Sequence, residues 1–177
     1  MVGGGQGSFI GDVHRRASRI DGMIDLVCGA FSSNPERSLK SAEALGVAPE
    51  RAYKSFEDMI KKEAELPEDE RMDFVSIVTP NHMHFPPAKM ALEYGFHVIC
   101  DKPVTLSLEE AFDLQKVVKE SGKVFALTHN YTGYPMVKQA RLMIQNGELG
   151  DIRKVVVQYL QGWMSTAVEE TEHKGAS

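Results

Sequence analysis

Short apolar runs alternate with amphipathic stretches along most of this chain. Five runs have the length and composition of buried strands: residues 25–31, 74–78, 97–100, 124–128 and 155–160. Near-continuous apolar strands separated by helices are typical of a parallel sheet that is covered on both faces. The pattern therefore predicts an α/β, doubly wound domain.

Capping and stop signals mark the expected helices. Asn34 can cap a helix that begins at Pro35, and Ser55 and Ser107 each precede acidic residues in a capping-box-like arrangement. Glycines such as Gly122 then end several helical stretches. The sequence predicts helices over residues 12–19, from 35 to near 46, and over 55–64, 86–94, 107–122 and 135–146.

The two ends of the chain fit this pattern less well. A glycine-rich turn begins at Gly3, and such a turn needs a strand running into it, yet only two residues precede it. Residues 155–160 look like the first strand of a further domain, and periodicity is lost after Trp163, where we expect a mobile tail. We therefore expect a fragment: one domain over residues 1–150 that lacks most of its first strand, and the start of a second over 151–177.

Composition narrows the range of functions. The 177 residues carry a formal charge of −5, with isolated basic pairs and no clustered positive face, which argues against a nucleic-acid partner. No signal peptide and no apolar stretch near the ~20 residues of a membrane span is visible, so we expect a cytoplasmic protein that does not bind membranes. Cys28 and Cys100 fall in apolar runs and are expected to be reduced core thiols.

The glycine-rich stretch of residues 3–7 resembles the start of a dinucleotide fingerprint. One glycine makes the turn, and the next lets the backbone approach a pyrophosphate at a helix N-terminus. A flexible, glycine-rich terminus is the alternative. On the first interpretation the cofactor-binding residues of this stretch are Gly3, Gly5, Gln6, Phe9 and Ile10.

The fingerprint departs from its usual spacing. The third glycine would fall at Ser8, whereas Gly11 is better placed to begin the helix over residues 12–19, so the loop is three residues longer than usual. In dinucleotide-binding folds an acid at the end of the second strand normally binds the ribose 2′-hydroxyl. Here the corresponding corner, after residues 25–31, carries Ser32 and Ser33, with Arg37 one turn later. Hydroxyl groups and an arginine can hold a 2′-phosphate, which favours NADP slightly over NAD; a helix cap with a solvated arginine is equally consistent.

Two further corners carry polar chemistry. Thr79, Pro80 and Asn81 end the run 74–78 and point a hydroxyl and an amide toward the expected crevice. His82 and His84 are two residues apart, but no acids or cysteines stand nearby in ligand spacing, so we expect no metal site. Turn formation and cofactor packing explain the two histidines instead, and His84 is the candidate for cofactor binding.

Lys102 directly follows the run 97–100, between Asp101 and Pro103. An ammonium group at the carboxyl end of a parallel strand can hydrogen-bond a substrate hydroxyl and stabilise alkoxide character as a hydride leaves. Lys102 is therefore the candidate catalytic residue, and Asp101 and Lys102 are also candidates for cofactor binding. Asn130 ends the next strand in the same manner and is a further candidate for cofactor binding.

Together these motifs resemble the Gfo/Idh/MocA family of NAD(P)-dependent oxidoreductases. The resemblance rests on the glycine loop and on residues 79–84, 95–103 and 130–135, in that order. It implies an N-terminal Rossmann domain, and a C-terminal α/β domain whose open sheet binds substrate and makes dimer contacts. The implied activity is hydride transfer between NAD(P) and a sugar, inositol or related polyol, by a homo-oligomer in the complete form.

The resemblance also implies residue roles. Lys102 matches the lysine that contacts the reacting hydroxyl, residues 79–81 match cofactor contacts, and Asn130 matches a residue near the nicotinamide. Asp101 stands where glutamate is commoner, and Thr132 where arginine often occurs. The family's proton acceptor has no counterpart here, so we expect the chain alone to be inactive. A catalytically silent nucleotide-binding or regulatory protein on the same fold is the alternative.

Overall fold

The computed structural model of the chain describes residues 1–160, 162 and 165. Two compact units are present, one over Met1–Asn130 and one that begins at Tyr131. The tail expected after Trp163 lies outside the described residues, apart from Ser165.

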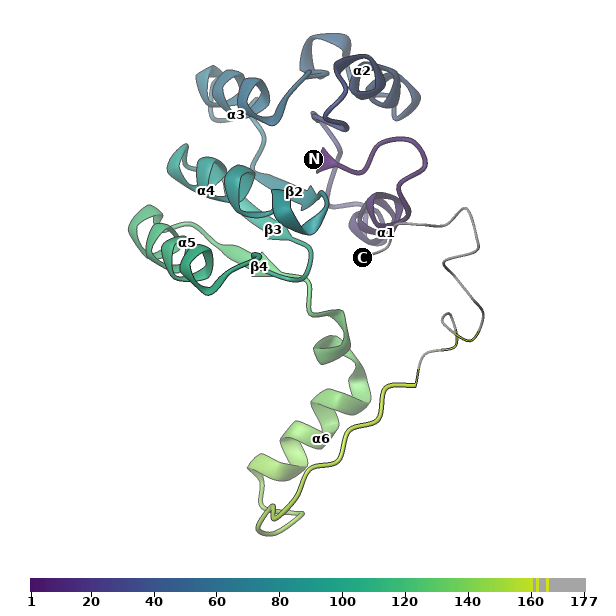
Figure 1. Cartoon of the computed structure of the whole chain (residues 1–177), viewed down its shortest axis with the longest axis vertical. Helices are drawn as coiled ribbons and strands as arrows, with labels where there is room; N and C mark the ends of the chain where they lie inside the picture. The colour runs from purple at the N-terminus through teal and green to yellow at the C-terminus, as the bar shows by residue number, and fades with distance from the viewer. Residues whose placement is uncertain (161, 163–164, 166–177) are drawn as a thin grey trace. The chain divides into compact units, whose positions relative to one another are not determined.

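A four-stranded parallel sheet forms the centre of the first unit (Figure 1). Its strands lie in the order β1 (Val2–Gly3), β2 (Phe74–Val78), β3 (His97–Cys100) and β4 (Phe125–Leu127). Val75 pairs with Val98, and Val98 with Phe125, so the three longer strands are in register and point the same way. The α/β class and the parallel sheet expected from the sequence are confirmed.

Residues 25–31 differ from the expected strand. They make isolated bridges only, from Ala30 to Val2 and from Gly29 to Ala52. The reason is that β1 contributes just two residues, so a longer ladder has nothing to pair with. The terminal ammonium of Met1 donates to the Cys28 carbonyl at 2.9 Å and ties the same segment to β1.

Five helices of the first unit connect these strands: α1 (Phe9–Ser18), α2 (Pro35–Ala44), α3 (Phe56–Glu65), α4 (Phe85–Glu93) and α5 (Leu108–Ser121). Short 3-10 turns add η1 (Pro49–Arg51) and η2 (Asn81–Met83). The predicted caps are confirmed, because Asn34, Ser55 and Ser107 each accept a hydrogen bond from the amide three residues later. Gly122 ends α5 in the left-handed conformation.

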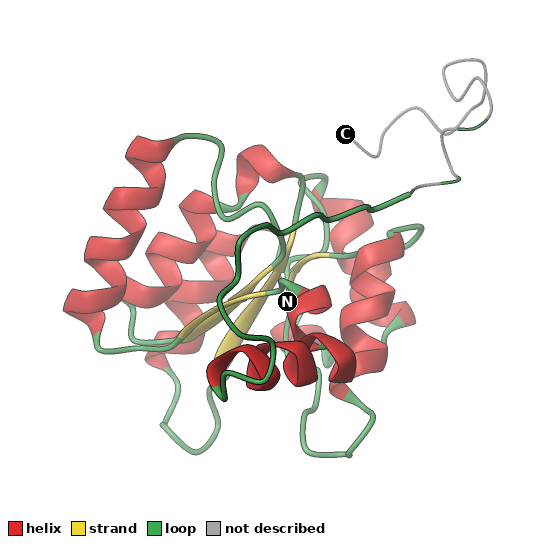
Figure 2. Ribbon diagram, turned by 90° about the horizontal axis from the view of Figure 1, so that it is seen from below, coloured by secondary structure: helices red, strands yellow, loops and turns green. Residues whose placement is uncertain are grey.

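Helices lie on both sides of the strands (Figures 1 and 2). Successive side chains of β2 point to opposite faces of the sheet, and both faces have helices against them. Val75 and Ile77 are fully buried in the core that α3, α4 and α5 complete, whereas Ser76 between them meets His14 of α1. One face of the sheet is thus covered by α3, α4 and α5, and on the other face α1 covers β2, whereas Ala126 of β4 is exposed there.

The start of α1 corrects the expected helix over residues 12–19. Ser8 caps the helix by accepting a hydrogen bond from the Gly11 amide at 3.3 Å, so the helix already begins at Phe9. Gly11 therefore lies inside the first turn instead of preceding the helix.

Both cysteines are buried and free, as expected for core thiols. Burial raises the pKa of Cys28, and it raises the pKa of Cys100 to about 12, with the neighbouring Asp101 carboxylate adding to the second effect. At neutral pH both groups are unreactive thiols.

The second unit contains α6 (Pro135–Gln145), which has no buried residue. Residues 155–160 correct another expectation, because they form no strand. A strand requires a partner for its backbone groups, and within the described part of this unit none is paired with it. No helix among the described residues is long and apolar enough to cross a bilayer.

Candidate functional site

The polar corners predicted from the sequence meet at the carboxyl edge of the sheet. Because β2, β3 and β4 are parallel, Thr79, Asp101 and Thr128 follow their last residues on the same edge. The Asp101 amide donates to the Ile77 carbonyl at 3.0 Å, and the Thr128 amide donates to Cys100 at 3.0 Å, so the ladder continues into the corners. The expectation that Thr79 and Lys102 share one edge is confirmed.

Lys102 is exposed, and the carboxylate of the neighbouring Asp101 is bound by another residue. The Thr128 hydroxyl donates to Oδ1 of Asp101 at 2.6 Å. Within the described residues Lys102 forms no ion pair, so its ammonium group can donate to a ligand. The Lys102–Pro103 peptide bond is cis.

The turn after β2 is fixed by its own hydrogen bonds. Oγ1 of Thr79 donates to the Met83 carbonyl at 2.9 Å, which closes the turn over η2. Pro80 and Asn81 are exposed at its tip, so the Asn81 amide faces solvent. This turn therefore offers a ligand an amide side chain on a fixed backbone.

His84 lies beneath these corners instead of on their surface. Its ring is 1% exposed, with Nδ1 2.6 Å from the Pro103 carbonyl and Nε2 3.1 Å from the Thr79 carbonyl. His82 is exposed. Within the described residues no three His, Cys, Asp or Glu side chains are grouped so as to hold a metal ion.

The glycine loop packs directly against α1. A Cβ on Gly11 would lie 2.4 Å from the Gly4 Cα, and a Cβ on Gly4 would lie 3.0 Å from the Gly11 Cα. Gly4 also has a φ of +75°, which disfavours any side chain. Gly11 thus supplies the close helix–strand contact that the third glycine of a dinucleotide fingerprint provides.

The amides of the loop divide into two groups. The Gly5 amide donates a hydrogen bond to the Phe31 carbonyl at 3.2 Å, and the Gln6 amide donates one to Oγ of Ser41 at 3.1 Å. Within the described part of the chain, the amides of Phe9 and Ile10 at the start of α1 have no hydrogen-bond partner. Free amides at the positive end of a helix dipole suit a pyrophosphate, so this corner fits a dinucleotide.

The corner after residues 25–31 lies next to this loop through the Gly5–Phe31 hydrogen bond. Ser32 Oγ accepts from the Asn34 amide at 3.1 Å, and Asn34 in turn caps α2. The Arg37 side chain is exposed. This corner therefore caps α2 and also leaves the Arg37 guanidinium group available to a ligand.

Three supporting residues were missed by the sequence interpretation. Ser41, 3% exposed, holds the Gln6 amide, and Nη1 of Arg15 donates to the Gly4 carbonyl at 2.6 Å. Thr128 orients Asp101. For Ser41 the sequence holds a weak signal, because a serine on the buried face of a helix needs a hydrogen-bond partner. For Arg15 and Thr128 it holds none, because their partners are distant in the sequence.

His14 adds a titratable group to the α1 side of the sheet. Its Nδ1 lies 3.0 Å from Oγ of Ser76. Burial lowers the pKa of His14, and the negative charge of Asp101 opposes this only in part. The ring is therefore mainly neutral at pH 7.

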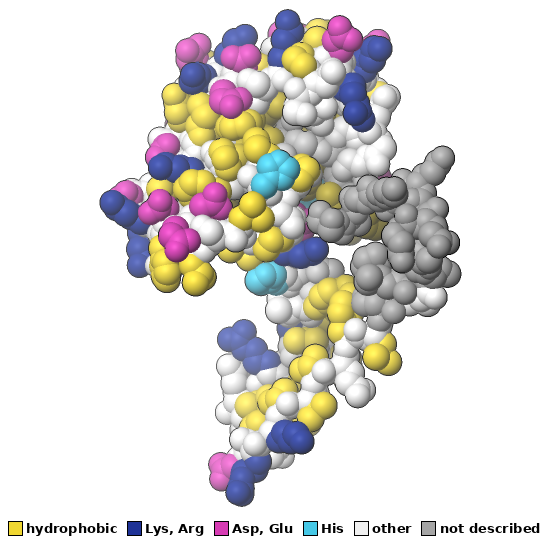
Figure 3. Space-filling model, viewed as in Figure 1, with side chains coloured by type: hydrophobic (Ala, Val, Ile, Leu, Met, Phe, Trp, Pro, Cys, Tyr) yellow, Lys and Arg dark blue, Asp and Glu magenta, His cyan; other side chains and the backbone are white. Residues whose placement is uncertain are grey.

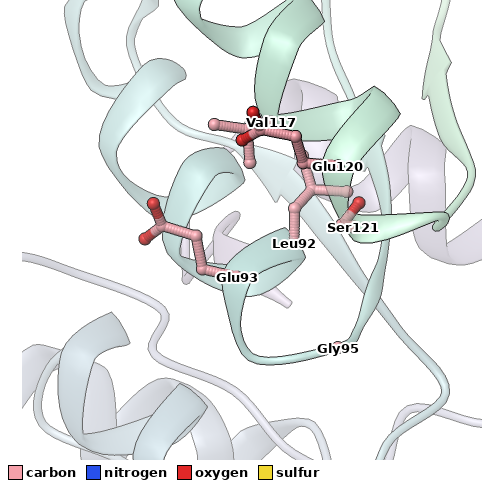
Figure 4. Close-up of a pocket in the computed structure, with 6 residues that line it drawn as sticks. All are labelled: Leu92, Glu93, Gly95, Val117, Glu120 and Ser121. Atoms are coloured by element: carbon pink, nitrogen blue, oxygen red, sulfur yellow. The ribbon is translucent and has the colours of Figure 1, made fainter.

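The first unit also contains a cavity away from the carboxyl edge of the sheet. A cavity of about 300 Å³ lies at the amino end of β3, where α4 and α5 end, far along the strand from Lys102 (Figure 4). It is lined by Leu92, Glu93, Gly95, Val117, Glu120 and Ser121. Basic and acidic side chains are interspersed over the helices on the face seen in Figure 3, consistent with the small net charge.

Comparisons with known proteins agree with this geometry. Residues 1–140 match the family model described as an oxidoreductase family with an NAD-binding Rossmann fold. The uncharacterised oxidoreductase YfiI of Bacillus subtilis is 38% identical over 94% of the chain and 42% of its own length. Levoglucosan dehydrogenase of Pseudarthrobacter phenanthrenivorans is 30% identical over 92% of the chain and 40% of its own length.

Solved structures are similar as well. An inositol dehydrogenase homologue from Azotobacter vinelandii, complexed with NADH and myo-inositol, has a TM-score of 0.82 and 42% identity, over 86% of this chain and 40% of that one. An oxidoreductase from Sinorhizobium meliloti has a TM-score of 0.80 and 53% identity, over 85% and 41%. The chain thus spans about two fifths of the length of these relatives. A Rossmann sheet with this glycine loop, an Asp-Lys-Pro corner and a family match over residues 1–140 establish that the chain belongs to the Gfo/Idh/MocA family of oxidoreductases.

Proposed function

We propose that this chain is the cofactor-binding part of a dehydrogenase that moves a hydride between NAD(P) and a sugar, inositol or related polyol. The observation that carries the proposal is the exposed ammonium of Lys102 at the same sheet edge as the Thr79 turn. The names of relatives support the substrate class, since one is a levoglucosan dehydrogenase and another was solved with NADH and myo-inositol.

The cofactor is held by backbone and side chains from three corners. The amides of Phe9 and Ile10 receive the pyrophosphate at the N-terminus of α1, with Gly3, Gly5 and Gln6 shaping the loop. Thr79, Pro80, Asn81, Asp101 and Asn130 complete the site along the sheet edge. When bound, NAD(P) accepts or donates the hydride.

Lys102 acts on the reacting hydroxyl. In the oxidative direction a bound nicotinamide would accept the hydride of the carbinol carbon, and a base would take the hydroxyl proton as the carbonyl forms. The ammonium of Lys102 donates a hydrogen bond to the oxygen as negative charge develops on it. The relatives are more than twice as long as this chain, and we place the base in that additional part.

Direct titration tests this proposal. The chain, titrated with NADH and with NADPH while nicotinamide fluorescence is followed, is expected to bind at one site and to release the dinucleotide when phosphate analogues compete. The complete protein is expected to reduce NAD(P)⁺ in the presence of a polyol such as myo-inositol. Binding without turnover on any polyol of a broad panel would favour the silent nucleotide-binding alternative, and no binding would exclude both.

Ser32, Ser33 and Arg37 give a slight preference for NADP in this proposal. Substitution of Arg37 by Ala is expected to raise the Kd of NADPH about ten- to a hundredfold, which corresponds to losing one charged hydrogen bond of about 1.5–3 kcal/mol, and to leave the Kd of NADH unchanged. Lys61→Ala, on the exposed side of α3, is the matched control. An equal effect of Arg37→Ala on both dinucleotides would contradict the preference.

A further inference from the structure

The ring of His84 connects the two corners on which the site depends. It is buried at the point where η2 meets α4, and its two nitrogens face the backbone carbonyls of Thr79 and Pro103. One carbonyl belongs to the turn after β2, and the other to the residue that follows Lys102. Within the described residues no other donor reaches either oxygen.

The backbone around Lys102 is therefore held from both sides. The Asp101 amide is bound to the Ile77 carbonyl of β2 at 3.0 Å, and the Pro103 carbonyl is bound to Nδ1 of His84 at 2.6 Å. Lys102 itself is exposed and forms no ion pair with any residue that the structure describes. Its ammonium can be placed reproducibly only if the backbone on each side is fixed.

We propose that His84 is a positioning residue for Lys102, acting through a hydrogen bond from Nδ1–H to the Pro103 carbonyl. A carbonyl oxygen only accepts, so this contact requires the hydrogen on Nδ1. A second hydrogen bond, from Nε2 to the Thr79 carbonyl 3.1 Å away, forms only when the ring carries both hydrogens, and it is secondary for Lys102. His84 thus serves the site from below and does not contact the cofactor. This inference rests on the function proposed above for Lys102.

Two substitutions of His84 test the contributions of Nδ1 and Nε2 separately. The amide nitrogen of Asn occupies nearly the place of the histidine Nδ1, and that of Gln nearly the place of Nε2. Each variant keeps a donor for one of the two carbonyls and has none for the other, so the two variants are expected to have similar stability. A role limited to folding would therefore not distinguish His84→Asn from His84→Gln, whereas the positioning role does.

The first readout uses the chain itself and needs no turnover. Backbone ¹⁵N relaxation at Lys102 is expected to give an order parameter near the rigid value of about 0.85 in the wild type and in His84→Asn, and below about 0.6 in His84→Gln. Melting by circular dichroism checks that both variants are folded. Should His84→Gln not fold, the same measurement in His84→Asn decides, because a mobile Lys102 there already overturns the proposal. Equal order parameters in two folded variants would also overturn it.

The second readout uses the complete enzyme with NAD⁺ and myo-inositol. The kcat of His84→Gln is expected to be at least about tenfold lower than that of His84→Asn, with the same Kd of NADH in both variants. If Lys102→Ala leaves kcat unchanged, the proposed role of Lys102 is wrong, and the role of His84 that rests on it is wrong as well. If Lys102→Ala lowers kcat while the Asn and Gln variants behave alike, only the role of His84 fails.

Discussion

At the scale of single residues, the exposed ammonium of Lys102 is the group on which the chemistry depends. Substituting Lys102 by Ala in the complete enzyme is expected to lower kcat about a hundredfold or more, which is typical of losing one charged transition-state donor. The Kd of NADH, measured by fluorescence, is expected to stay the same, because the cofactor is held mainly by the loop and α1. Lys119→Ala on the exposed side of α5 is the control. Unchanged kcat with a raised Kd would assign Lys102 to cofactor binding instead.

Glu63 is the residue whose charge matters most for stability. Its side chain is fully buried, and it accepts hydrogen bonds from Arg51 (Nε, 3.0 Å), from the Tyr53 hydroxyl (2.9 Å) and from the Met72 amide (3.0 Å). Burial by itself would raise the pKa of Glu63, but these three donors outweigh burial and hold the pKa below its ordinary value. The ionised carboxylate therefore joins α3 to the segments on either side of it.

Replacing Glu63 by Gln is expected to lower the free energy of unfolding by about 1–3 kcal/mol at pH 7, as measured in urea. Because the pKa of Glu63 is lower in the folded chain, its contribution is complete above the ordinary value of 4.5 and is lost as the pH falls through the folded value. The difference between wild type and variant should thus shrink below pH 4.5. Glu65→Gln, exposed on the same helix, should change little. A difference that does not depend on pH would refute the charged network.

At the scale of elements, the position of α1 is set by the contact between Gly11 and Gly4. Alanine normally favours a helix over glycine by about 1 kcal/mol. Here a Cβ would stand 2.4 Å from backbone, which cannot move like a flexible side chain, so overpacking of about 1–3 kcal/mol outweighs the gain in propensity. Gly11→Ala is expected to lower Tm and to raise the Kd of NADH about tenfold, because the amides of Phe9 and Ile10 move with the helix.

Thermal melts and NADH titration measure both effects. Gly133→Ala is the matched control, since a Cβ there meets nothing within 4 Å. A higher Tm for Gly11→Ala, with unchanged NADH affinity, would show that the helix adjusts freely and that this contact does not position it.

At the scale of the whole molecule, stability is distributed unevenly between the two units. Every buried side chain of the described residues lies between Met1 and Leu114, and α6 in the second unit has none. Amides of β2 and β3 should therefore exchange with solvent only through global unfolding, and those of α6 through local opening.

Hydrogen exchange followed by mass spectrometry or NMR measures this difference. The amides of α6 are expected to exchange at least about a thousandfold faster than those of β3, since that ratio needs a difference of only ~4 kcal/mol in opening free energy. Equal protection of the two elements would mean that α6 is held by contacts beyond its own unit.

The sequence by itself determined the elements whose signals are local. Asn34, Ser55 and Ser107 cap their helices as expected, because a cap is a hydrogen bond between residues three apart. The runs 74–78 and 97–100 became the central strands because they are mostly apolar, and alternate residues such as Val75 and Val98 are buried in the core. Their shared direction brought Thr79 and Asp101 to one edge, so the place of the candidate site followed from the same pattern.

Only the tertiary structure decided the contacts between distant segments. Residues 25–31 and 155–160 have strand-like composition, yet a strand exists only where a partner supplies its hydrogen bonds, and sequence composition does not contain that partner. The partner of Gly11 is Gly4 across the loop, and the partners of His84 are carbonyls 5 and 19 residues away. Such pairings depend on how the chain packs as a whole, which is why the sequence located the site but the fold revealed what holds it in place.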